Sequence, residues 1–463
     1  MRRIRRIAAL ALCAALLAAI ALLMLTRWPA TAATAAMGRV HVYPAWLLQR
    51  GFALVFSAAP GWSGEDAAAA LTLARQGYRV IGVDTPALLA RAAQQSGCLY
   101  LPGVLEGYSE AEQRRAGGGR YREPILAGRG AGGTLVYLAL VQAPVLAFSG
   151  GVVLDAVPEL AFDGAFCGQT AAARPSGRYA VSVRATAAGI PAVYLDSGAG
   201  DAASAGFMKA MAARGGGLTD LSREPAASLG ARYAAACRTL AARQVPKPLA
   251  DLPLVELPVT DGGDGSSGGG GAFAILYSGD GGWRDLDRSL AAVLVGRGLP
   301  VVGVDLLHYY WKPRSPEDAA RDLARIESYY QRSWGRQQVI LIGFSLGANV
   351  LPFLVNRLPP GPRAALRLVT LLSPERATAF QIDPRNWLGL STHAGLTPVG
   401  PELQRLPRTL VQCVYGAAEA ARSLCTTPAA QGVRVLRKIG DHHFDYDYGR
   451  LADDILQAAK AGR

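Results

Sequence analysis

Residues 339–358 read VILIGFSLGANVLPFLVNRL, an apolar strand pattern followed, through the pentapeptide GFSLG (343–347), by a helical pattern. A serine held between a strand and a helix by flanking glycines is typical of a nucleophile elbow, whose sharp turn presents the hydroxyl at the end of the strand. The pentapeptide alone is common by chance. Its position between a strand and a helix favours a nucleophilic role for Ser345 over that of an ordinary serine at a helix start.

The residues around the elbow alternate between short apolar runs and helical patterns. Six runs are rich in β-forming residues and predict strands: Phe273–Ser278, Val301–Asp305, Gln338–Gly343, Leu366–Leu372, Thr409–Tyr415 and Val433–Ile439. Between them, Ser315 and Pro316 are typical of a helix cap and first helical residue. Nearly continuous apolar strands that alternate with helices predict a mostly parallel sheet covered on both faces. The sequence therefore predicts an α/β fold of the α/β-hydrolase type.

A serine nucleophile needs a histidine base, and the chain has five histidines. In this fold the base follows the last strand, where the sequence reads Gly440-Asp441-His442-His443-Phe444. We predict His442 as the base, since a glycine lies two residues before it and an aromatic residue two after it. His443 remains an alternative.

The acid that orients the base is expected in the loop after the preceding strand. Glu419 is the only carboxylate between Tyr415 and Cys425, so we predict it as the acid. The chain order Ser345, Glu419, His442 is the order expected for this fold. A surface role for Glu419 is the alternative.

An oxyanion hole takes one backbone N–H from the residue after the nucleophile and another from a loop after an early strand. We predict that Leu346 supplies the first, and that Gly279 or Asp280, in the loop Ser278–Trp283, supplies the second. Asp280 either forms an Asx turn or binds a cationic group of the substrate. We also expect Trp283 and His308 to border the substrate pocket.

An internal repeat organises the chain. Leu54–Asp84 aligns with Ile275–Asp305 at a constant offset of 221, and Ala127–Gly133 aligns with Ile342–Ala348. Two matches in the same order indicate a duplicated domain. Gly130 stands at the position of Ser345 and Ala59 at that of Asp280, so the first copy is expected to be a degenerate, non-catalytic α/β-hydrolase-like domain.

Length and composition fit this division. The chain has 463 residues, too many for one ordinary core, and its 51% of hydrophobic and 18% of charged residues are typical of globular domains. We predict domains over 38–245 and 272–463, joined by a Pro/Gly/Ser-rich linker at 246–271.

The N-terminus is predicted to be an export signal. Four arginines precede an uninterrupted apolar run from Ile7 to Leu25, and small residues follow. Residues 1–36 would be either a cleaved signal peptide or a retained membrane anchor. In both cases the remaining chain is expected to lie in the periplasm.

Five cysteines follow the leader, in a compartment that permits disulfides. We favour Cys413–Cys425, which brackets the predicted acid loop, and then Cys98–Cys167. One cysteine must then remain unpaired within the chain.

The charge pattern points to no nucleic acid. The formal net charge is +13, and five of these charges belong to leader arginines, which leaves +8 spread over the rest of the chain. Because the sequence has no run of basic residues, we interpret the excess positive charge as part of a solvated surface. An attraction to an anionic membrane is also compatible with this charge. We expect no metal and no cofactor, because histidines and cysteines do not cluster.

Several segments resemble the VirJ/AcvB family of exported bacterial virulence-associated proteins, in its longer, two-domain form. They are SGDGGW (278–283), YYWKPRSPEDAARDL (309–323), GFSLGANVLPF (343–353), the 413–425 segment and DHHFDYDY (441–448). One departure lies in the acid loop, where relatives carry an aspartate near the position of Ala421. The resemblance implies periplasmic hydrolysis of aminoacyl-phosphatidylglycerol, notably its lysyl form, at the membrane surface.

Two alternative functions remain open from the sequence. One is a non-catalytic periplasmic factor that assists virulence or type IV secretion, since one copy of the domain already lacks the serine. The other is an esterase of different specificity. A binding protein has no need of an elbow serine, a base and an oxyanion loop together, which favours the enzyme.

Overall fold

The computed structural model describes residues 29–34, 37–46, 48–117, 121–144, 146–168, 173–174, 177–186, 190–215, 217–221, 227–243, 249–259, 271–382 and 396–461. The chain divides into two compact units. The N-terminal unit comprises residues 1–118 and 122–245, and the C-terminal unit residues 119–121 and 246–463. The division after Val245 falls where the sequence places the end of the first domain.

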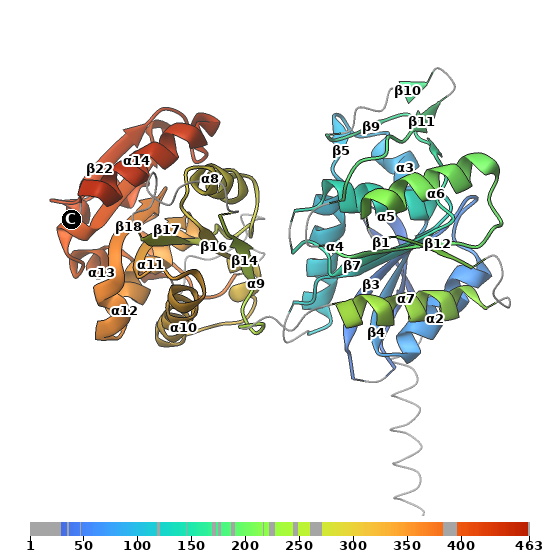
Figure 1. Ribbon diagram of the computed structural model, residues 1–463, viewed down its shortest axis with the longest axis horizontal. Coiled ribbons are helices and arrows are strands. Elements are labelled where there is room, and N and C mark those ends of the chain that lie inside the picture. Colours follow the sequence, from blue (N-terminus) through green and yellow to red (C-terminus); the bar gives the residue numbers. More distant parts are fainter. Residues whose placement is uncertain are drawn as a thin grey trace, which may run out of the picture. The chain divides into compact units, whose positions relative to one another are not determined.

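The C-terminal unit is built on a seven-stranded sheet (Figure 1). In spatial order its strands are β14 (Leu254–Leu257), β16 (Val301–Val304), β15 (Ala272–Tyr277), β17 (Gln338–Phe344), β18 (Leu366–Leu372), β21 (Val411–Gly416) and β22 (Arg434–Lys438). All neighbours are parallel except β14 and β16. The six strands predicted for this unit are confirmed, with ends displaced by at most two residues.

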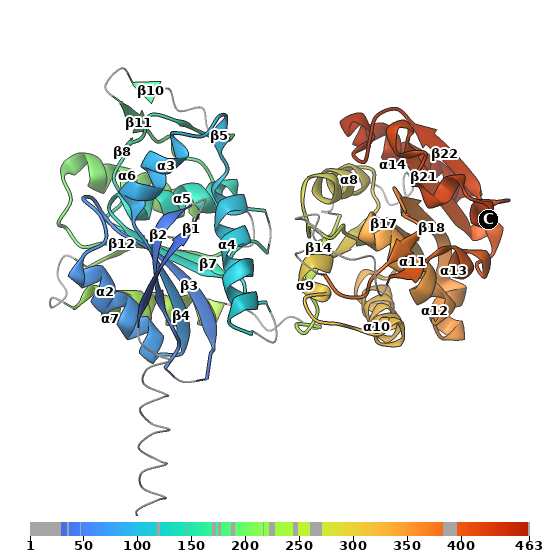
Figure 2. The same ribbon diagram turned by 180° about the vertical axis from the view of Figure 1, so that it is seen from behind.

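Helices cover both faces of this sheet, as Figures 1 and 2 show. On one face α8 (Asp285–Gly296) packs against α14 (Tyr448–Ala461). The opposite face carries α10 (Pro316–Trp334) and α11 (Leu346–Asn356), whose apolar side chains join one buried cluster with strand residues. Short helices α9 (Leu306–Tyr309), α12 (Pro360–Ala365) and α13 (Gly400–Gln404) lie in the connections. The predicted start of α10 is confirmed, since the Ser315 hydroxyl accepts a hydrogen bond from the Asp318 N–H.

The N-terminal unit repeats this sheet. Its eight strands are, in spatial order, β1 (Ala30–Thr34), β2 (Gly38–Tyr43), β4 (Tyr78–Val83), β3 (Gly51–Phe56), β6 (Ile125–Arg129), β7 (Gly150–Leu154), β12 (Ala192–Asp196) and β13 (Leu218–Asp220). From β2 to β13 the order and directions match those from β14 to β22. The predicted duplication therefore extends to the topology of both sheets.

The helices of the N-terminal unit follow the same plan. On one face α2 (Gly64–Arg75) packs against α7 (Leu229–Arg243), the counterparts of α8 and α14. On the other lie α3 (Thr85–Ala92), α4 (Leu101–Arg115), α5 (Ala131–Gln142) and α6 (Ala202–Gly215). A small sheet of β10 (Ala173–Arg174), β11 (Arg178–Ala180) and β8 (Glu159–Ala161), and the pair β5 (Cys98–Leu99) and β9 (Ala165–Phe166), are additions to this unit.

Two strands lie in segments that were predicted to be outside the two domains. Residues 254–257, placed in the linker, form strand β14, with Leu254 and Val255 buried. This strand is the second copy's counterpart of β2, so each unit begins with an antiparallel strand. Residues 30–34, placed in the leader, form strand β1 against β2. Residues 1–28 and 35–36 of the predicted leader and the Gly-rich stretch 260–270 lie outside the described residues.

Both predicted disulfides are confirmed. Cys413 pairs with Cys425 and Cys98 with Cys167, while Cys237 is a buried free cysteine.

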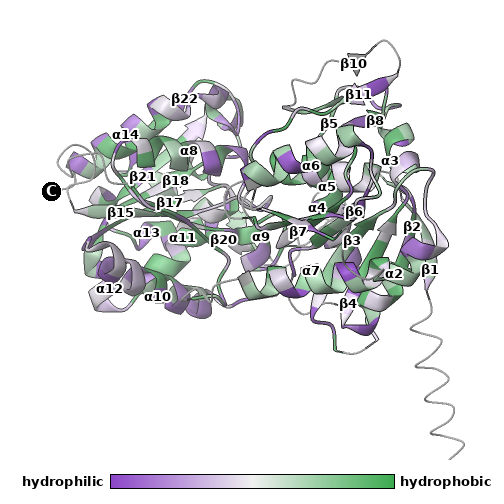
Figure 3. Ribbon diagram, turned by 45° about the vertical axis from the view of Figure 1, so that its right-hand side comes forward, coloured by the Kyte–Doolittle hydropathy of each residue, from purple (hydrophilic) through white to green (hydrophobic). Residues whose placement is uncertain are grey.

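Figure 3 shows apolar residues concentrated in the strands of each sheet and polar ones on the outer helices. Over the part of the chain that the structure describes, no helix is both long and apolar enough to cross a membrane.

Candidate active site

Ser345 lies at a strained turn between β17 and α11. Its φ is 52° and its ψ is −113°, a conformation that a residue with a side chain rarely adopts. The Ser345 N–H donates to the carbonyl of Leu372, at the end of β18, over 2.9 Å. A Cβ on Gly347 would overlap the carbonyl oxygen of Tyr277, and one on Gly343 would overlap the backbone of Gly347. The glycines of the pentapeptide are therefore required by close backbone contacts, as the elbow interpretation predicts.

Glu419 and His442 meet at the same edge of the sheet. Glu419 ends a single helical turn that follows β21, and its Oε1 lies 2.9 Å from Nδ1 of His442. An ionised carboxylate can only accept, so Nδ1 carries the proton and Nε2 is left as the acceptor nitrogen. The His442 ring also lies against Phe344, the residue before Ser345, with 4.9 Å between ring centroids. The structure thus brings His442 and Glu419 together beside the elbow.

The backbone at Gly416 allows this approach. A Cβ at Gly416 would overlap the carbonyl oxygen of Asp441, so the histidine loop crosses directly over the end of β21. The Ala418 N–H donates to the carbonyl of Gly440 over 3.1 Å. These contacts fix the two loops against each other and set the spacing between the acid and the histidine.

Glu419 is buried and ionised. Its residue is 5% exposed, and the same Oε1 that meets His442 accepts from the Arg422 guanidinium. Burial acts to raise the pKa of Glu419, but the Arg422 hydrogen bond and the neighbouring His442 outweigh it, so the pKa lies below its ordinary value. The carboxylate is therefore charged at neutral pH, as an orienting acid requires.

His443, the alternative base, has other contacts. Its ring stacks on that of Tyr446 with centroids 5.7 Å apart and an interplanar angle of 7°. The backbone N–H of His443 donates to the side chain of Asp441 over 2.9 Å. The geometry therefore favours His442 as the partner of Glu419.

The predicted oxyanion loop lies beside the elbow. A Cβ built on Gly279 would stand 3.6 Å from the Ser345 Cβ, so this backbone faces the serine. Leu346 is the first residue of α11, and the N–H groups of a first helical turn have no partner within the helix. Asp280 follows Gly279 and is partly exposed. Both predicted sources of the oxyanion hole therefore flank Ser345.

The position of Trp283 does not support its predicted role in substrate binding. Its side chain is buried at 3% exposure and packs flat on β16, where a Cβ on Gly303 would overlap the indole ring. The backbone N–H of Trp283 donates to Oδ2 of Asp305 over 3.1 Å. Trp283 anchors the oxyanion loop on the sheet and has little surface left for a substrate.

His308 has a similar supporting position. Its side chain is 8% exposed, and Nδ1 lies 3.3 Å from Oδ2 of Asp305. Burial acts to raise the pKa of Asp305, but His308 and the backbone N–H groups of His308 and Trp283 outweigh it, so the pKa is lowered. The structure gives His308 a place beside this carboxylate, which does not support the predicted contact with substrate.

Sequence reasoning missed the residues that support the site: Ser278, Asp305, Gly416, Arg422 and Ser373, whose hydroxyl lies 3.5 Å from the backbone carbonyl oxygen of His442. The internal repeat contains a signal for two of them. Ser278 accepts from the Leu306 N–H just as Ser57 accepts from the Thr85 N–H, and Asp305 matches Asp84, which accepts from the Trp62 N–H. The other three carry no pattern that is visible in one sequence.

The N-terminal unit keeps the elbow but not its chemistry. Gly130 has a φ of 54° and a ψ of −125°, nearly the values at Ser345. Ala58 stands where the second copy has Gly279, and its Cβ lies 3.2 Å from a Cβ built on Gly130. The hydroxyl is missing, and a methyl group fills the space above the turn. The prediction of a degenerate copy therefore agrees with this geometry.

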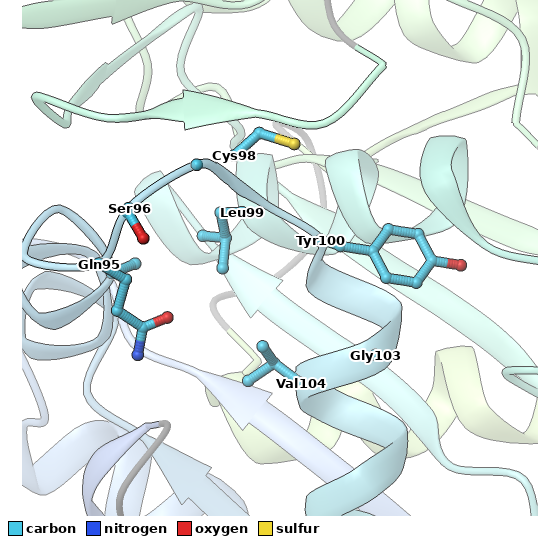
Figure 4. Close-up of a pocket in the computed structure, with 9 residues that line it drawn as sticks. Gln95, Ser96, Cys98, Leu99, Tyr100, Gly103 and Val104 are labelled. Atoms are coloured by element: carbon cyan, nitrogen blue, oxygen red, sulfur yellow. The ribbon is translucent and has the colours of Figure 1, made fainter.

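An open pocket of about 310 Å³ lies elsewhere in the N-terminal unit, beside Cys98 (Figure 4). It is lined by residues 95–100 together with Ala92, Gly103 and Val104, around strand β5 and the start of α4. Its lining includes none of the residues of the elbow in either unit.

Within the described residues, no group of three or more His, Cys, Asp or Glu could hold a metal ion.

The parallel sheet, the elbow at Ser345 and the Glu419–His442 pair define the C-terminal unit as an α/β-hydrolase domain. In sequence, residues 271–463 match the family model described as bacterial virulence protein (VirJ). This match confirms the predicted resemblance to the VirJ/AcvB family over the C-terminal domain. No curated protein matches the chain in sequence.

Solved structures similar to the chain include several hydrolases. Est1E from Butyrivibrio proteoclasticus has a TM-score of 0.33 and 11% identity, over 46% of this chain and 96% of its own. Proline iminopeptidase from Mycobacterium smegmatis has a TM-score of 0.32 and 12% identity, over 45% and 100%. A serine hydrolase without lid from Xanthomonas campestris has a TM-score of 0.28 and 15% identity, over 47% and 97%.

We predict that Glu419→Gln lowers the free energy of unfolding at pH 7 by about 2 kcal/mol, because a charged hydrogen-bond acceptor is lost. The folded-state pKa of Glu419 is depressed, so its stabilisation is present above the ordinary glutamate value of about 4.3 and is lost as pH falls through the folded pKa. Denaturant unfolding from pH 7 down to pH 3 should show the difference from wild type shrinking.

The matched control for this series is Glu375→Gln, at an exposed glutamate of the same unit. It should change the unfolding free energy by less than about 0.5 kcal/mol. A difference between wild type and Glu419→Gln that does not vary with pH would contradict the assigned ionisation.

Proposed function

We propose that the C-terminal domain is a serine ester hydrolase that uses a triad of Ser345, His442 and Glu419. The observation that carries the proposal is the 2.9 Å contact between Glu419 and His442 beside the positive-φ turn that presents Ser345. Nε2 of His442 removes the proton from Ser345 Oγ as the oxygen attacks the ester carbonyl, and later passes it to the departing alkoxide. Water then attacks the acyl-serine by the same route, releasing the acid and restoring the hydroxyl.

The negative charge on the tetrahedral intermediate needs donors aimed at the developing oxyanion. The N–H of Leu346 and that of Gly279 or Asp280 flank the serine and are the proposed donors. Ionised Glu419 holds the Nδ1–H tautomer of His442 and stabilises the imidazolium that forms during the reaction.

The proposed substrate is the aminoacyl ester of lysyl-phosphatidylglycerol, at a membrane surface in the periplasm. The match of residues 271–463 to the VirJ family supports this choice. The scissile bond is a carboxylic ester, which suits acyl transfer through a serine. Asp280 adjoins the proposed oxyanion donors and is partly exposed, which supports the proposal that its carboxylate binds the ammonium groups of the lysyl moiety.

One observation favours a second candidate function, a non-catalytic factor in virulence or secretion. The N-terminal domain keeps the whole sheet but carries Gly130 at the elbow, under the methyl group of Ala58. A domain retained without its nucleophile is suited to binding. An esterase of other specificity is the remaining alternative for the C-terminal domain.

We predict that Ser345→Ala abolishes hydrolysis of both lysyl-phosphatidylglycerol and a p-nitrophenyl ester, with a loss of at least about 10⁴-fold in kcat. Released lysine and nitrophenol would be followed with the full exported chain. The control Ser423→Ala changes another buried serine of the same unit, and it should leave both rates within a few-fold.

Three outcomes separate the functions. Loss of both activities in Ser345→Ala supports the proposal, whereas nitrophenol release without lysine release would reject the lipid substrate. If the folded wild-type protein hydrolyses neither substrate, the non-catalytic factor would be favoured.

Asp280→Asn is expected to lower kcat/KM for lysyl-phosphatidylglycerol about tenfold and to leave p-nitrophenyl acetate hydrolysis unchanged, because only the first substrate carries ammonium groups. Asp285→Asn, at an exposed acid in the first turn of α8, is the control. Equal losses on the cationic and the neutral ester would mean that Asp280 has no part in recognising charge.

A further inference from the structure

One end of the sheet in the N-terminal domain carries exposed apolar side chains. Trp46 is 38% exposed and Leu48 is 86% exposed, and both lie in the connection between β2 and β3. The backbone of this connection is fixed, because the Trp46 N–H donates to the Ala74 carbonyl over 3.0 Å and the Arg50 N–H donates to the Gly77 carbonyl over 2.8 Å. The two apolar side chains are therefore held at the end of the sheet where the parallel strands β3 and β4 begin.

Cations surround these apolar side chains. The Arg75 guanidinium lies over the Trp46 ring, 5.3 Å from its centroid, and the exposed Arg122 donates to the carbonyl of the exposed Arg50 over 3.0 Å. Across the residues that the structure describes, none of these three arginines is paired with a carboxylate. We call the surface formed by Trp46, Leu48, Arg50, Arg75 and Arg122 the Trp46 edge.

The opposite end of the same sheet is acidic. The parallel strands β4, β7, β12 and β13 each end at an aspartate or are followed by one: Asp84, Asp155, Asp196 and Asp220. Of the acidic residues near the Trp46 edge, Glu123 is half-buried, and Glu112 is buried and paired with Arg79 and Arg115. Charge is thus separated along the strands, with the positive end at the Trp46 edge.

The chain enters the N-terminal domain at this positive end. Strand β1 runs antiparallel to β2 with Ala30 opposite Val42, and β2 leads directly into the connection that holds Trp46. The sequence before β1 contains the apolar run from Ile7 to Leu25, which is long enough to span a bilayer. The residues between Leu25 and Ala30 can extend over at most about 18 Å. A bilayer that holds the apolar run would therefore lie close to the Trp46 edge.

We propose that the Trp46 edge is a docking surface for a bilayer of anionic phospholipids. Indole rings are favoured at the level of the lipid headgroups, and a neighbouring leucine side chain can enter the boundary of the acyl chains. Arginines beside them attract anionic headgroups. The apolar side chains, the cations and the entry of the chain coincide at one end of the domain, which favours a bilayer over a protein partner. The inference makes no use of the proposed reaction.

The test measures which end of the N-terminal domain contacts lipid. The full chain is reconstituted in vesicles of phosphatidylglycerol and phosphatidylcholine, with an environment-sensitive fluorophore attached to Leu48→Cys. The matched control is Ala199→Cys, at an exposed position that follows β12 at the acidic end. Cys237 is buried, so wild type reports the background labelling.

We expect the emission of the label at position 48 to shift to shorter wavelength in these vesicles. A lipid with a nitroxide on its headgroup should quench this label at least about twofold more than the label at position 199, because the edge lies at the headgroup level.

Charge is tested by adding Arg50→Glu and Arg75→Glu to the Leu48→Cys chain. Each basic residue near an anionic surface favours binding about fivefold, so the quenching at position 48 should fall towards that at position 199. Vesicles of phosphatidylcholine alone should give the same loss with the unmodified arginines. Both arginines are exposed, and circular dichroism checks that the variants keep the wild-type fold.

The proposal is overturned if the label at position 48 is not quenched, or if both positions are quenched equally. A shift to shorter wavelength without nitroxide quenching would mean that another protein surface, such as a second copy of the chain, covers the edge. Quenching that survives both arginine substitutions and neutral vesicles would reject anionic lipid as the partner. None of these outcomes depends on whether Ser345 is a nucleophile.

Discussion

The close approach of backbone at the elbow is the constraint on which the site depends. Ser345 has a positive φ, a conformation that costs a residue with a side chain on the order of 1 kcal/mol. The turn persists because the Ser345 N–H is bonded to the next strand and because Gly343 and Gly347 let the strand and α11 lie in contact. The same turn puts the serine at the carboxyl edge of the sheet. The loops that follow the parallel strands β15, β18, β21 and β22 also begin at this edge.

The two domains separate what the fold requires from what the chemistry requires. Both keep a tryptophan packed on a strand glycine, an aspartate that accepts from the backbone N–H of that tryptophan, and a positive-φ turn before the helix. These features hold loops against the sheet and are present where no serine nucleophile exists. Ser345, the open space at Gly279 and the Glu419–His442 pair occur in the C-terminal domain, and they are the features that the proposed reaction uses.

The sequence predicted the strands, the duplication, both disulfides and the position of the elbow, because each depends on local pattern or on spacing along the chain. It placed β14 in a linker, since a short edge strand flanked by prolines and glycines carries a weak local signal. It assigned Trp283 and His308 to the substrate pocket because they follow strand ends. Their burial beside Asp305 is decided by tertiary packing, which spacing cannot reveal. The support from Ser373 and Gly416 was not predictable either, because it arises from contacts between loops distant in sequence.

If Ser345 is an activated nucleophile, as proposed, a covalent serine reagent should label it. The purified protein would be treated with diisopropyl fluorophosphate, which transfers its phosphoryl group to an activated serine oxygen with release of fluoride. Intact mass and peptide mapping would locate the adduct. The account predicts one adduct per chain, on the peptide that contains Ser345, and its loss in His442→Ala. A folded protein that takes up no label, or that is labelled at another residue, would contradict it.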